Sequence, residues 1–209
     1  MNYLLIISFI LAGYLFGSIP VGYVVARLYG INVTASGSGR TGGTNVLRAA
    51  GPVAAGLTVI GDVLKGMLPV YLLQAAGISP WVVALVGVAA VIGHNYSIFL
   101  GFRGGVGAGT AVGALGGISL PVGLLAAGCA LVALWFSGYA SILSTTIAVS
   151  GLLFLIIFAV LGLLPAGYIL FGALTLVLIV YALLPNYARL RAGTERKISK
   201  KSNHAAEVP

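Results

Sequence analysis

Charged residues are scarce in this sequence. Only 7% of its 209 residues are charged, against roughly 25% in soluble domains, and 60% are hydrophobic. This composition leaves too little polar surface to cover a water-soluble globule, and it is too apolar for a disordered chain. The apolar runs are continuous rather than alternating, which argues against a transmembrane β-barrel. The sequence therefore predicts an all-α polytopic membrane protein.

Acidic residues and cysteine are scarcer still. Asp62, Glu195 and Glu207 are the only acids against 11 Lys and Arg, giving a formal net charge of +8. In a membrane protein this excess follows from the positive-inside rule, so we expect no nucleic-acid partner. The single cysteine, Cys129, excludes an intrachain disulfide and a Cys-based metal cluster, and we expect it to be a buried structural thiol. No set of Cys, His, Asp and Glu suggests a metal site, and no cofactor is implied.

The apolar segments predict seven membrane helices. A spanning helix needs about 20 mainly apolar residues. The candidates are residues 3–28, 52–76, 81–100, 106–119, 121–136, 140–161 and 166–184. The first has neither a positive N-terminal region nor a convincing cleavage site, which favours a retained helix that is interrupted at Gly17–Pro20. The fourth is short for a full span, and the last is expected to end before Pro185.

The placement of basic residues predicts the orientation. Arg27, Arg40 and Arg48 flank the first loop, Arg103 lies in the third, and the residues from Arg189 to Lys201 form the tail. With seven spans and the N-terminus outside, every basic segment lies on the cytoplasmic side. We expect a membrane domain over residues 1–188 and a basic cytoplasmic tail over 189–209.

Two of four polar clusters are rich in glycine. Residues 37–48 combine glycine amides, hydroxyls and arginines, and they lead into a predicted helix after Thr44 whose N-terminus would favour an anion. Residues 93–107 could wrap a phosphate with backbone amides, although they lack the order of a P-loop. The alternatives are an ordinary flexible loop and, for His94, a hydrogen-bonded structural histidine.

The other two clusters carry ionisable groups. Asp62 and Lys65 are three residues apart, so they can pair on one helix face, either as a structural pair or as part of a site. Residues 186–197 are basic and follow the last helix, where they could contact anionic headgroups or bind substrate.

Together these motifs resemble those of the bacterial acyl-phosphate:glycerol-3-phosphate acyltransferases. The matching segments are Gly37-Ser38-Gly39 with Thr44-Asn45-Val46-Leu47-Arg48, Asp62-x-x-Lys65-Gly66, Gly93-His94 with Phe102-Arg103-Gly104-Gly105-x-Gly107, and Asn186 with Arg189 and Gly193-Thr194-Glu195. The resemblance implies a seven-helix domain in the bacterial cell membrane with a site facing the cytoplasm. It implies acyl transfer from acyl phosphate to glycerol 3-phosphate, which yields lysophosphatidate and phosphate. Membrane lipid and the soluble enzyme that makes acyl phosphate are further expected partners.

The resemblance also nominates site residues. Ser38 and Arg48 are the expected catalytic residues. The expected substrate- and phosphate-binding residues are Thr44, Asn45, Lys65, His94, Arg103, Gly104, Gly105, Gly107 and Asn186.

The chain departs from the family pattern at four places. Val106 stands where the family usually has Lys, Leu183 where it usually has His, Arg40-Thr41 where Asn-Ile is common, and Gly138 where a basic residue is usual. The loss of the usual Lys and His could alter the substrate or leave an inactive paralogue. Arg40 restores one positive charge.

An acyl phosphate is already activated, so direct attack by the glycerol hydroxyl is the expected mechanism. A substrate phosphate oxygen or His94 would take the proton, because Ser38, His94 and Asp62 are too scattered to suggest a triad. Gly13, Gly17 and Gly22 are expected to open a groove for the acyl chain. The competing readings are an organic-anion transporter and a non-catalytic lipid-binding paralogue.

Overall fold

The computed structural model describes residues 2–198, and this part of the chain is helical. The α-helices are α1 (Tyr3–Ser18), α2 (Val21–Leu28), α3 (Gly43–Ala75), α4 (Pro80–Asn95), α5 (Ala108–Ile118), α6 (Leu120–Ser137), α7 (Ala140–Val160) and α8 (Ile169–Arg191). Short 3₁₀ turns lie at Val33–Ala35, Ile98–Leu100 and Ala166–Tyr168. Within residues 2–198 the only strand-like pairing is an isolated bridge between Ser97 and Arg103. The all-α prediction is confirmed.

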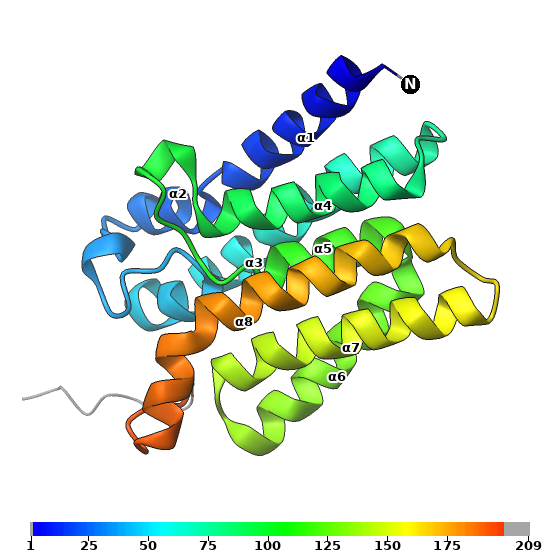
Figure 1. Cartoon of the computed structure of the whole chain (residues 1–209). Coiled ribbons are helices and arrows are strands. Elements are labelled where there is room, and N and C mark those ends of the chain that lie inside the picture. The colour runs from blue at the N-terminus through cyan, green and yellow to red at the C-terminus, as the bar shows by residue number, and fades with distance from the viewer. Residues whose placement is uncertain (1, 199–209) are drawn as a thin grey trace, which may run out of the picture.

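The helices form a bundle in which α1 packs on α4, α3 on α5, and α7 on both α6 and α8 (Figure 1). Five stretches are long and apolar enough to cross a membrane: Tyr3–Leu28, Gly43–Ala75, Leu120–Ser137, Ala140–Val160 and Ala166–Arg191. The helices α4 and α5 are apolar but shorter, at 16 and 11 residues. The described N-terminus and the end of α8 lie at opposite ends of the bundle (Figure 1).

The predicted interruption of the first segment is present between α1 and α2. Pro20 has no amide hydrogen, and the helix stops at Ser18. The carbonyls there are bound by side chains from elsewhere in the chain: Ser97 Oγ, in the loop after α4, donates to the oxygen of Ser18, and Lys65 Nζ of α3 donates to that of Ile19 at 2.8 Å. Such partners let a broken helix persist inside an apolar environment.

A second break divides α3. Gly51 has φ 84° and ψ −179°, which a residue with a side chain rarely adopts. The next residue, Pro52, disfavours helical geometry in the residue before it. The straight part of α3 therefore starts where the sequence predicted the second membrane helix to begin.

Two predicted helix ends were wrong. The helix α4 stops at Asn95 rather than continuing to residue 100, because Tyr96 turns to φ −131° and ψ 66° and the chain enters a compact loop. The helix α8 passes through Pro185 and ends at Arg191. Pro185 cannot bond the carbonyl four residues earlier, and α8 bends near this end without terminating (Figure 1).

Helix packing also overturns the expectation that small residues open a groove for the acyl chain. Gly13 and Gly17 form no groove: a Cβ on either would collide with Val86 or Ala90 of α4. Gly22 is similarly closed by Thr41 and Thr58. These glycines therefore allow close approach of helices, and the space between them is filled.

Cys129 is exposed rather than buried. The helix α6 packs through another face, which carries Val122, Ala126 and Ala130. The apolar run around Cys129 therefore reflects an outward-facing surface and not a core position.

Candidate active site

The loop from Ile31 to Gly42 is organised by the buried side chain of Asn45. Its Nδ2 group contacts the carbonyl oxygens of Val33, Ser36 and Arg40 at 2.8–3.1 Å, and its Oδ1 accepts from the amide of Ser38 at 3.1 Å. Gly37 is required beside it, because a Cβ there would overlap Asn45 Oδ1. Both ends of the Asn45 amide are thus used in shaping the loop.

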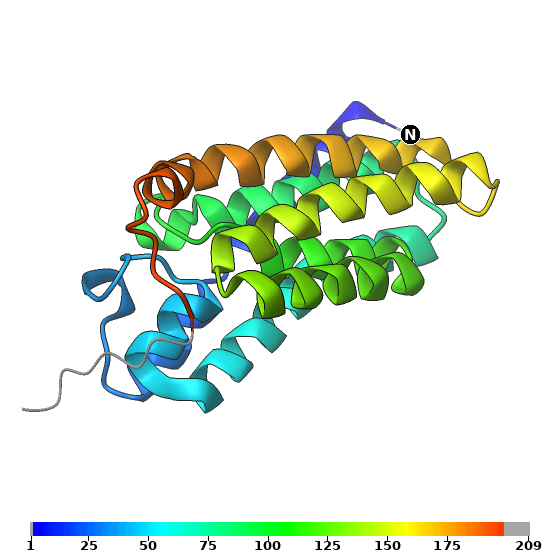
Figure 2. The ribbon, with the colours of Figure 1, turned by 90° about the horizontal axis from the view of Figure 1, so that it is seen from below.

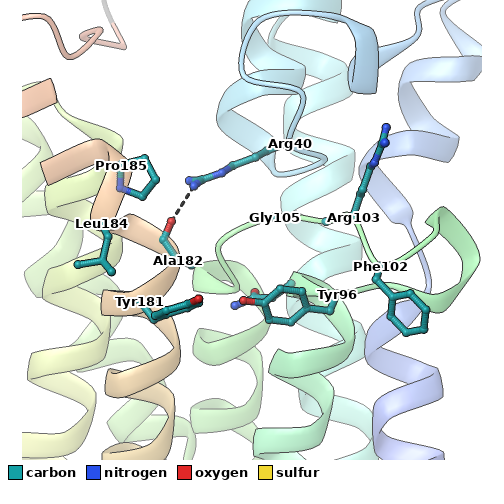
Figure 3. A pocket seen from close by; sticks show the side chains of 11 residues that line it. Arg40, Tyr96, Phe102, Arg103, Gly105, Tyr181, Ala182, Leu184 and Pro185 are labelled. Atoms are coloured by element: carbon teal, nitrogen blue, oxygen red, sulfur yellow. Dashed lines mark hydrogen bonds between the residues drawn. The ribbon is translucent and has the colours of Figure 1, made fainter. Parts of the chain in front are cut away.

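Arg40 extends from this loop to α8 (Figure 3). Its Nη1 donates to Asn186 Oδ1 at 3.1 Å, and its Nη2 donates to the carbonyl oxygen of Ala182 at 2.6 Å. Ala182 lies three residues before Pro185, in the part of α8 where proline disturbs the helical hydrogen bonds. Burial lowers the pKa of the Arg40 guanidinium, the charge of Arg189 lowers it further, and Glu195 partly opposes both.

The glycines of residues 104–107 allow a second loop to lie against α4. A Cβ on Gly104 would overlap the carbonyl oxygens of His94 and Asn95, and one on Gly105 would overlap His94 Nε2. The amide of Gly105 donates to the carbonyl oxygen of His94 at 3.1 Å. The amide of Thr41 donates to the carbonyl oxygen of Gly104 at 3.4 Å. The second contact ties the two loops together.

His94 belongs to a buried ionic cluster with Asp62 and Lys65. Asp62 Oδ1 lies 2.9 Å from Lys65 Nζ and 3.3 Å from His94 Nδ1, and all three side chains are at most 5% exposed. The predicted Asp62–Lys65 pair is confirmed. His94 is buried beside Asp62 whereas Ser38 is exposed on the 31–42 loop, and within residues 2–198 no contact joins the two side chains into a triad.

A cavity of about 370 Å³ lies between the 96–105 loop and α8 (Figure 3). Polar and aromatic groups share its wall. The lining residues are Arg40, Asn95, Tyr96, Phe102, Arg103, Gly104, Gly105, Tyr181, Ala182, Leu184 and Pro185. The phenol groups of Tyr96 and Tyr181 point toward each other, while the Arg103 side chain turns away from Arg40 (Figure 3). A concave site with a few polar groups among apolar ones is typical of a small-molecule site.

The segment after α8 crosses the end of the bundle toward α3 (Figure 2). Glu195 accepts from Asn186 Nδ2 at 2.7 Å and from Arg189 Nε at 2.6 Å. The carbonyl oxygen of Arg196 accepts from Arg48 Nη2 at 3.1 Å, and the amide of Ile198 donates to the carbonyl oxygen of Gly138 at 2.9 Å. We call residues 193–198 the strap. It joins α8, α3 and the α6–α7 turn at the end of the bundle that carries both loops.

The structure brings together part of the predicted residue set. Arg103, Gly104 and Gly105 line the cavity. Asn186 accepts a hydrogen bond from Arg40, which also lines it. Ser38 is exposed on the loop of Arg40, Thr44 lies in the first turn of α3, and Arg48 contacts the strap. Lys65, His94 and Asn45 are buried in the internal contacts described above, and Gly107, at φ 92°, precedes α5.

Sequence reasoning missed Asn95, Tyr96 and Tyr181 as cavity residues. The first two lie inside a polar cluster that the sequence singled out, so their neighbourhood was detectable. Tyr181 lies within an apolar helix, and nothing in its local pattern distinguishes it from an interfacial aromatic residue.

Comparison with known proteins identifies the family to which the chain belongs. The model of the family described as "Glycerol-3-phosphate acyltransferase" matches residues 7–193. The chain belongs to this family. A glycerol-3-phosphate acyltransferase of Rubrobacter xylanophilus is 40% identical over 199 residues, covering 92% of this chain and 95% of the relative. One from Roseiflexus sp. is 43% identical over 201 residues, covering 93% and 96%.

Solved structures of PlsY (YgiH), an integral membrane glycerol 3-phosphate acyltransferase, have the same fold. Its glycerol 3-phosphate form superposes on this acyltransferase with a TM-score of 0.84 at 34% identity, covering 92% of this chain and 94% of that one. Its lysophosphatidic acid form gives a TM-score of 0.83 at 35% identity with the same coverage.

One departure from the family pattern lies in the core of this acyltransferase, and a second packs against that core. Leu183 is 1% exposed in the main apolar cluster, and Val106 packs against the same cluster. Neither side chain lines the cavity. Lys197 lies beside the fourth departure, Gly138, with its Nζ 5.5 Å from the centre of the Tyr139 ring.

Proposed function

We propose that this chain transfers a fatty acyl group from acyl phosphate to the 1-hydroxyl of glycerol 3-phosphate, giving lysophosphatidate and inorganic phosphate. Family membership over residues 7–193 carries the proposal. The solved relatives in glycerol 3-phosphate and lysophosphatidic acid forms support the acceptor and the product. Acyl phosphate as donor rests on the resemblance of the motifs.

In the proposed reaction the hydroxyl oxygen attacks the acyl carbonyl carbon, and the bond from that carbon to the phosphate oxygen breaks. The departing phosphate oxygen takes the hydroxyl proton. This route is favoured over His94 as base, because His94 is buried beside Asp62. The protein then contributes mainly by positioning two anions and offsetting their repulsion.

Ser38 and Arg48 remain the proposed catalytic residues, with Ser38 as a hydrogen-bond donor and Arg48 as a phosphate ligand. Both belong to the end of the bundle where the strap crosses, since Arg48 contacts the strap and Ser38 shares a loop with Arg40. Arg103, Gly104, Gly105 and Asn186 are proposed to bind phosphate groups near the cavity. Asn45 and Lys65 are better explained as residues that hold the loops and the α1–α2 break.

We further propose seven membrane crossings with the N-terminus outside and the site at the cytoplasmic face of a bacterial cell membrane. The opposite placement of the described chain ends supports an odd number of crossings (Figure 1). Arg40, Arg48 and Arg189 meet at one end through Asn186, Glu195 and the strap, as the positive-inside rule requires.

The deciding experiment uses the purified protein in lipid nanodiscs with acyl phosphate and glycerol 3-phosphate. We expect phosphate release that requires both substrates, together with lysophosphatidate formation. Phosphate release without glycerol 3-phosphate, or no lysophosphatidate at all, would contradict the proposal. Anion uptake by proteoliposomes without acyl transfer would instead identify a transporter.

A further inference from the structure

A short apolar segment in the loop after α4 exposes large side chains. Residues 98–102 read Ile-Phe-Leu-Gly-Phe and contain no polar or charged side chain. Ile98, Phe99 and Phe102 are 46%, 60% and 62% exposed. Exposed apolar side chains of this size, gathered on one short segment, mark an interaction surface rather than a solvated loop.

Phe102 holds a backbone conformation that its own turn does not favour. Its φ is 61°, and within residues 2–198 it is the only residue other than glycine with a positive φ. Gly101, directly before it, is also left-handed, with φ 60° and ψ 46°. Glycine or asparagine adopts this geometry at lower cost, whereas a bulky aromatic residue there is an outlier. The turn gives no reason for a phenylalanine at this position, which leaves the contact made by its exposed ring as the reason.

The base of the 98–102 segment is tied to α1. The amide of Phe102 donates to the carbonyl oxygen of Ser97 at 2.8 Å, which closes the loop. Ser97 Oγ in turn donates to the carbonyl oxygen of Ser18. The hydroxyl of Tyr14 donates to the carbonyl oxygen of Tyr96 at 2.9 Å. The segment therefore presents its apolar side chains in a fixed direction.

Two neighbouring side chains at this base point in opposite directions (Figure 3). The Arg103 guanidinium points toward the end of the bundle that carries Arg40. The Phe102 ring points the other way and reaches a level along the helices between Tyr181 and Leu184. Those two residues are exposed on the stretch of α8 that is long and apolar enough to cross a membrane. A cation on the polar side and an aromatic ring on the apolar side is the arrangement expected at a membrane interface.

The exposed apolar surface continues from the 98–102 segment onto α1. Leu15, Phe16 and Ile19 are exposed near the end of α1 to which the segment is tied. The helix α1 belongs to another stretch that can cross a membrane, Tyr3–Leu28. The segment thus lies between two surfaces of the same kind, one on α1 and one on α8.

We propose that the 98–102 segment inserts into the membrane leaflet that surrounds this end of the bundle. Ile98, Phe99 and Phe102 lie among the acyl chains close to the headgroups, and Arg103 lies on the polar side. The partner is lipid rather than protein, because the exposed surfaces on both sides belong to stretches that can cross a membrane. Since Phe102 also lines the cavity, insertion places that wall of the cavity at the depth of the membrane interface. The inference does not depend on the reaction, and a chain that transfers no acyl group would still insert the segment.

The test measures the depth of single tryptophans in nanodiscs that hold one copy of the full chain. The native Trp81 and Trp135 are first replaced by phenylalanine. Ile98→Trp, Phe99→Trp and Phe102→Trp are then made separately, so that the result does not depend on one variant folding. Fluorescence quenching is measured with phospholipids brominated close to the glycerol, with phospholipids brominated at the chain end, and with aqueous iodide. Variants that melt with the parent protein decide the outcome.

Two further variants of the same background calibrate the depth. Val177→Trp lies on the exposed face of α8 within the apolar stretch, and bromine at the chain end should quench it most strongly. Ala192→Trp lies in the exposed turn that follows α8, where iodide should quench it and brominated lipid should not. We expect tryptophans in the 98–102 segment to be quenched most strongly by bromine close to the glycerol. Their quenching constant for iodide should be several-fold lower than that of Ala192→Trp.

Two results would overturn the inference. Iodide quenching equal to that of Ala192→Trp, without quenching by either brominated lipid, would place the 98–102 segment in water. Protection from iodide and from both brominated lipids would show that the protein itself covers the segment, because each disc holds no second copy.

Discussion

Lys65 donates from its ammonium group to the carbonyl oxygen of Ile19, 2.8 Å away, and thereby joins α3 to the break between α1 and α2. The same ammonium lies 2.9 Å from Asp62 Oδ1. One buried cation therefore pairs with a buried carboxylate and also binds a carbonyl oxygen at the break between the two helices.

Replacing Lys65 should destabilise the fold. Lys65→Met leaves Asp62 buried without its cation, and loss of one partner of a buried pair costs about 3–5 kcal/mol. We expect a clearly lower melting temperature in detergent micelles. The double variant Asp62→Asn/Lys65→Met should recover part of the loss, because it buries no unpaired charge. A single variant as stable as the parent protein would contradict the structural role.

Asn45 should be required for the shape of the 31–42 loop. Asn45→Asp keeps the Oδ1 acceptor for Ser38 but places an oxygen opposite three carbonyl oxygens. We expect faster proteolysis within residues 31–42 and at least a tenfold loss of kcat/KM. Thr34→Val, which removes only a local hydrogen bond to Asn32, is the control. Equal proteolysis of Asn45→Asp and the parent protein would show that the loop does not depend on this amide.

Arg48→Ala should reduce acyl transfer strongly in a protein that still inserts and purifies. Loss of one charge-assisted phosphate contact costs about 1.5–3 kcal/mol, equivalent to roughly ten- to a hundredfold in rate. Steady-state kinetics beside Arg191→Ala separate this effect from a general loss of positive charge. Near-normal turnover would remove Arg48 from the site and leave it as a ligand of the strap carbonyl.

Ser38 should not become acylated. Incubation with labelled acyl phosphate alone should give no labelled protein and no burst of phosphate, because no base contacts this exposed hydroxyl among residues 2–198 and the donor is already activated. Mass spectrometry of the peptide spanning Ser38 provides the measurement. Recovery of an acyl group on that peptide would replace direct transfer with a two-step mechanism.

The departures at Leu183 and Val106 should respond differently when the usual family residue is restored. Leu183→His places a polar ring in the apolar cluster and should lower stability by about 1–3 kcal/mol unless the ring finds a partner. Val106 is only half-buried and follows Gly105, so a lysine there could extend its ammonium toward the cavity.

Val106→Lys should therefore help most when Arg40 is absent. We expect Arg40→Ala/Val106→Lys to exceed Arg40→Ala in kcat/KM by about tenfold, or roughly 1.4 kcal/mol. Equal rates for these two variants would show that position 106 cannot replace the cation of Arg40. If the parent protein and every variant lack acyl transfer, the non-catalytic paralogue becomes the better account.

Local patterns predicted most of the helices. Residues Gly17–Pro20 marked the break after α1, the second apolar segment began at Pro52, and the Asp62–Lys65 spacing predicted its ion pair. Pro185 misled, because the rest of α8 remained helical around it, supported by the contacts of Arg40 and Glu195. Ile98, Phe99 and Leu100 continued the apolar run, although the turn at Tyr96 ends α4 before them and they form a 3₁₀ turn in the loop.

The motifs predicted several residues near the site, but the sequence did not show which side chains would be in contact. Hydropathy and spacing placed Arg40, Asn95 and Tyr181 in three separate segments, and only the packing of α4 and α8 brings them to one cavity. The role of Asn45 was likewise hidden, because an amide that organises a loop and one that binds phosphate have the same sequence signal. The small residues Gly13 and Gly17 were assigned to a groove because the sequence does not show which helix fills the space beside them.

The strap limits how this protein can be engineered. A reporter domain fused directly after Gly193 would displace Glu195, Arg196 and Ile198 and so detach the end of α8 from Arg48 and from the α6–α7 turn. The same reporter attached after the last residue would leave those contacts in place. The position of a tag therefore affects the assay. A fusion that removes the strap would measure a protein in which the end of α8 has lost its contacts with Arg48 and the α6–α7 turn.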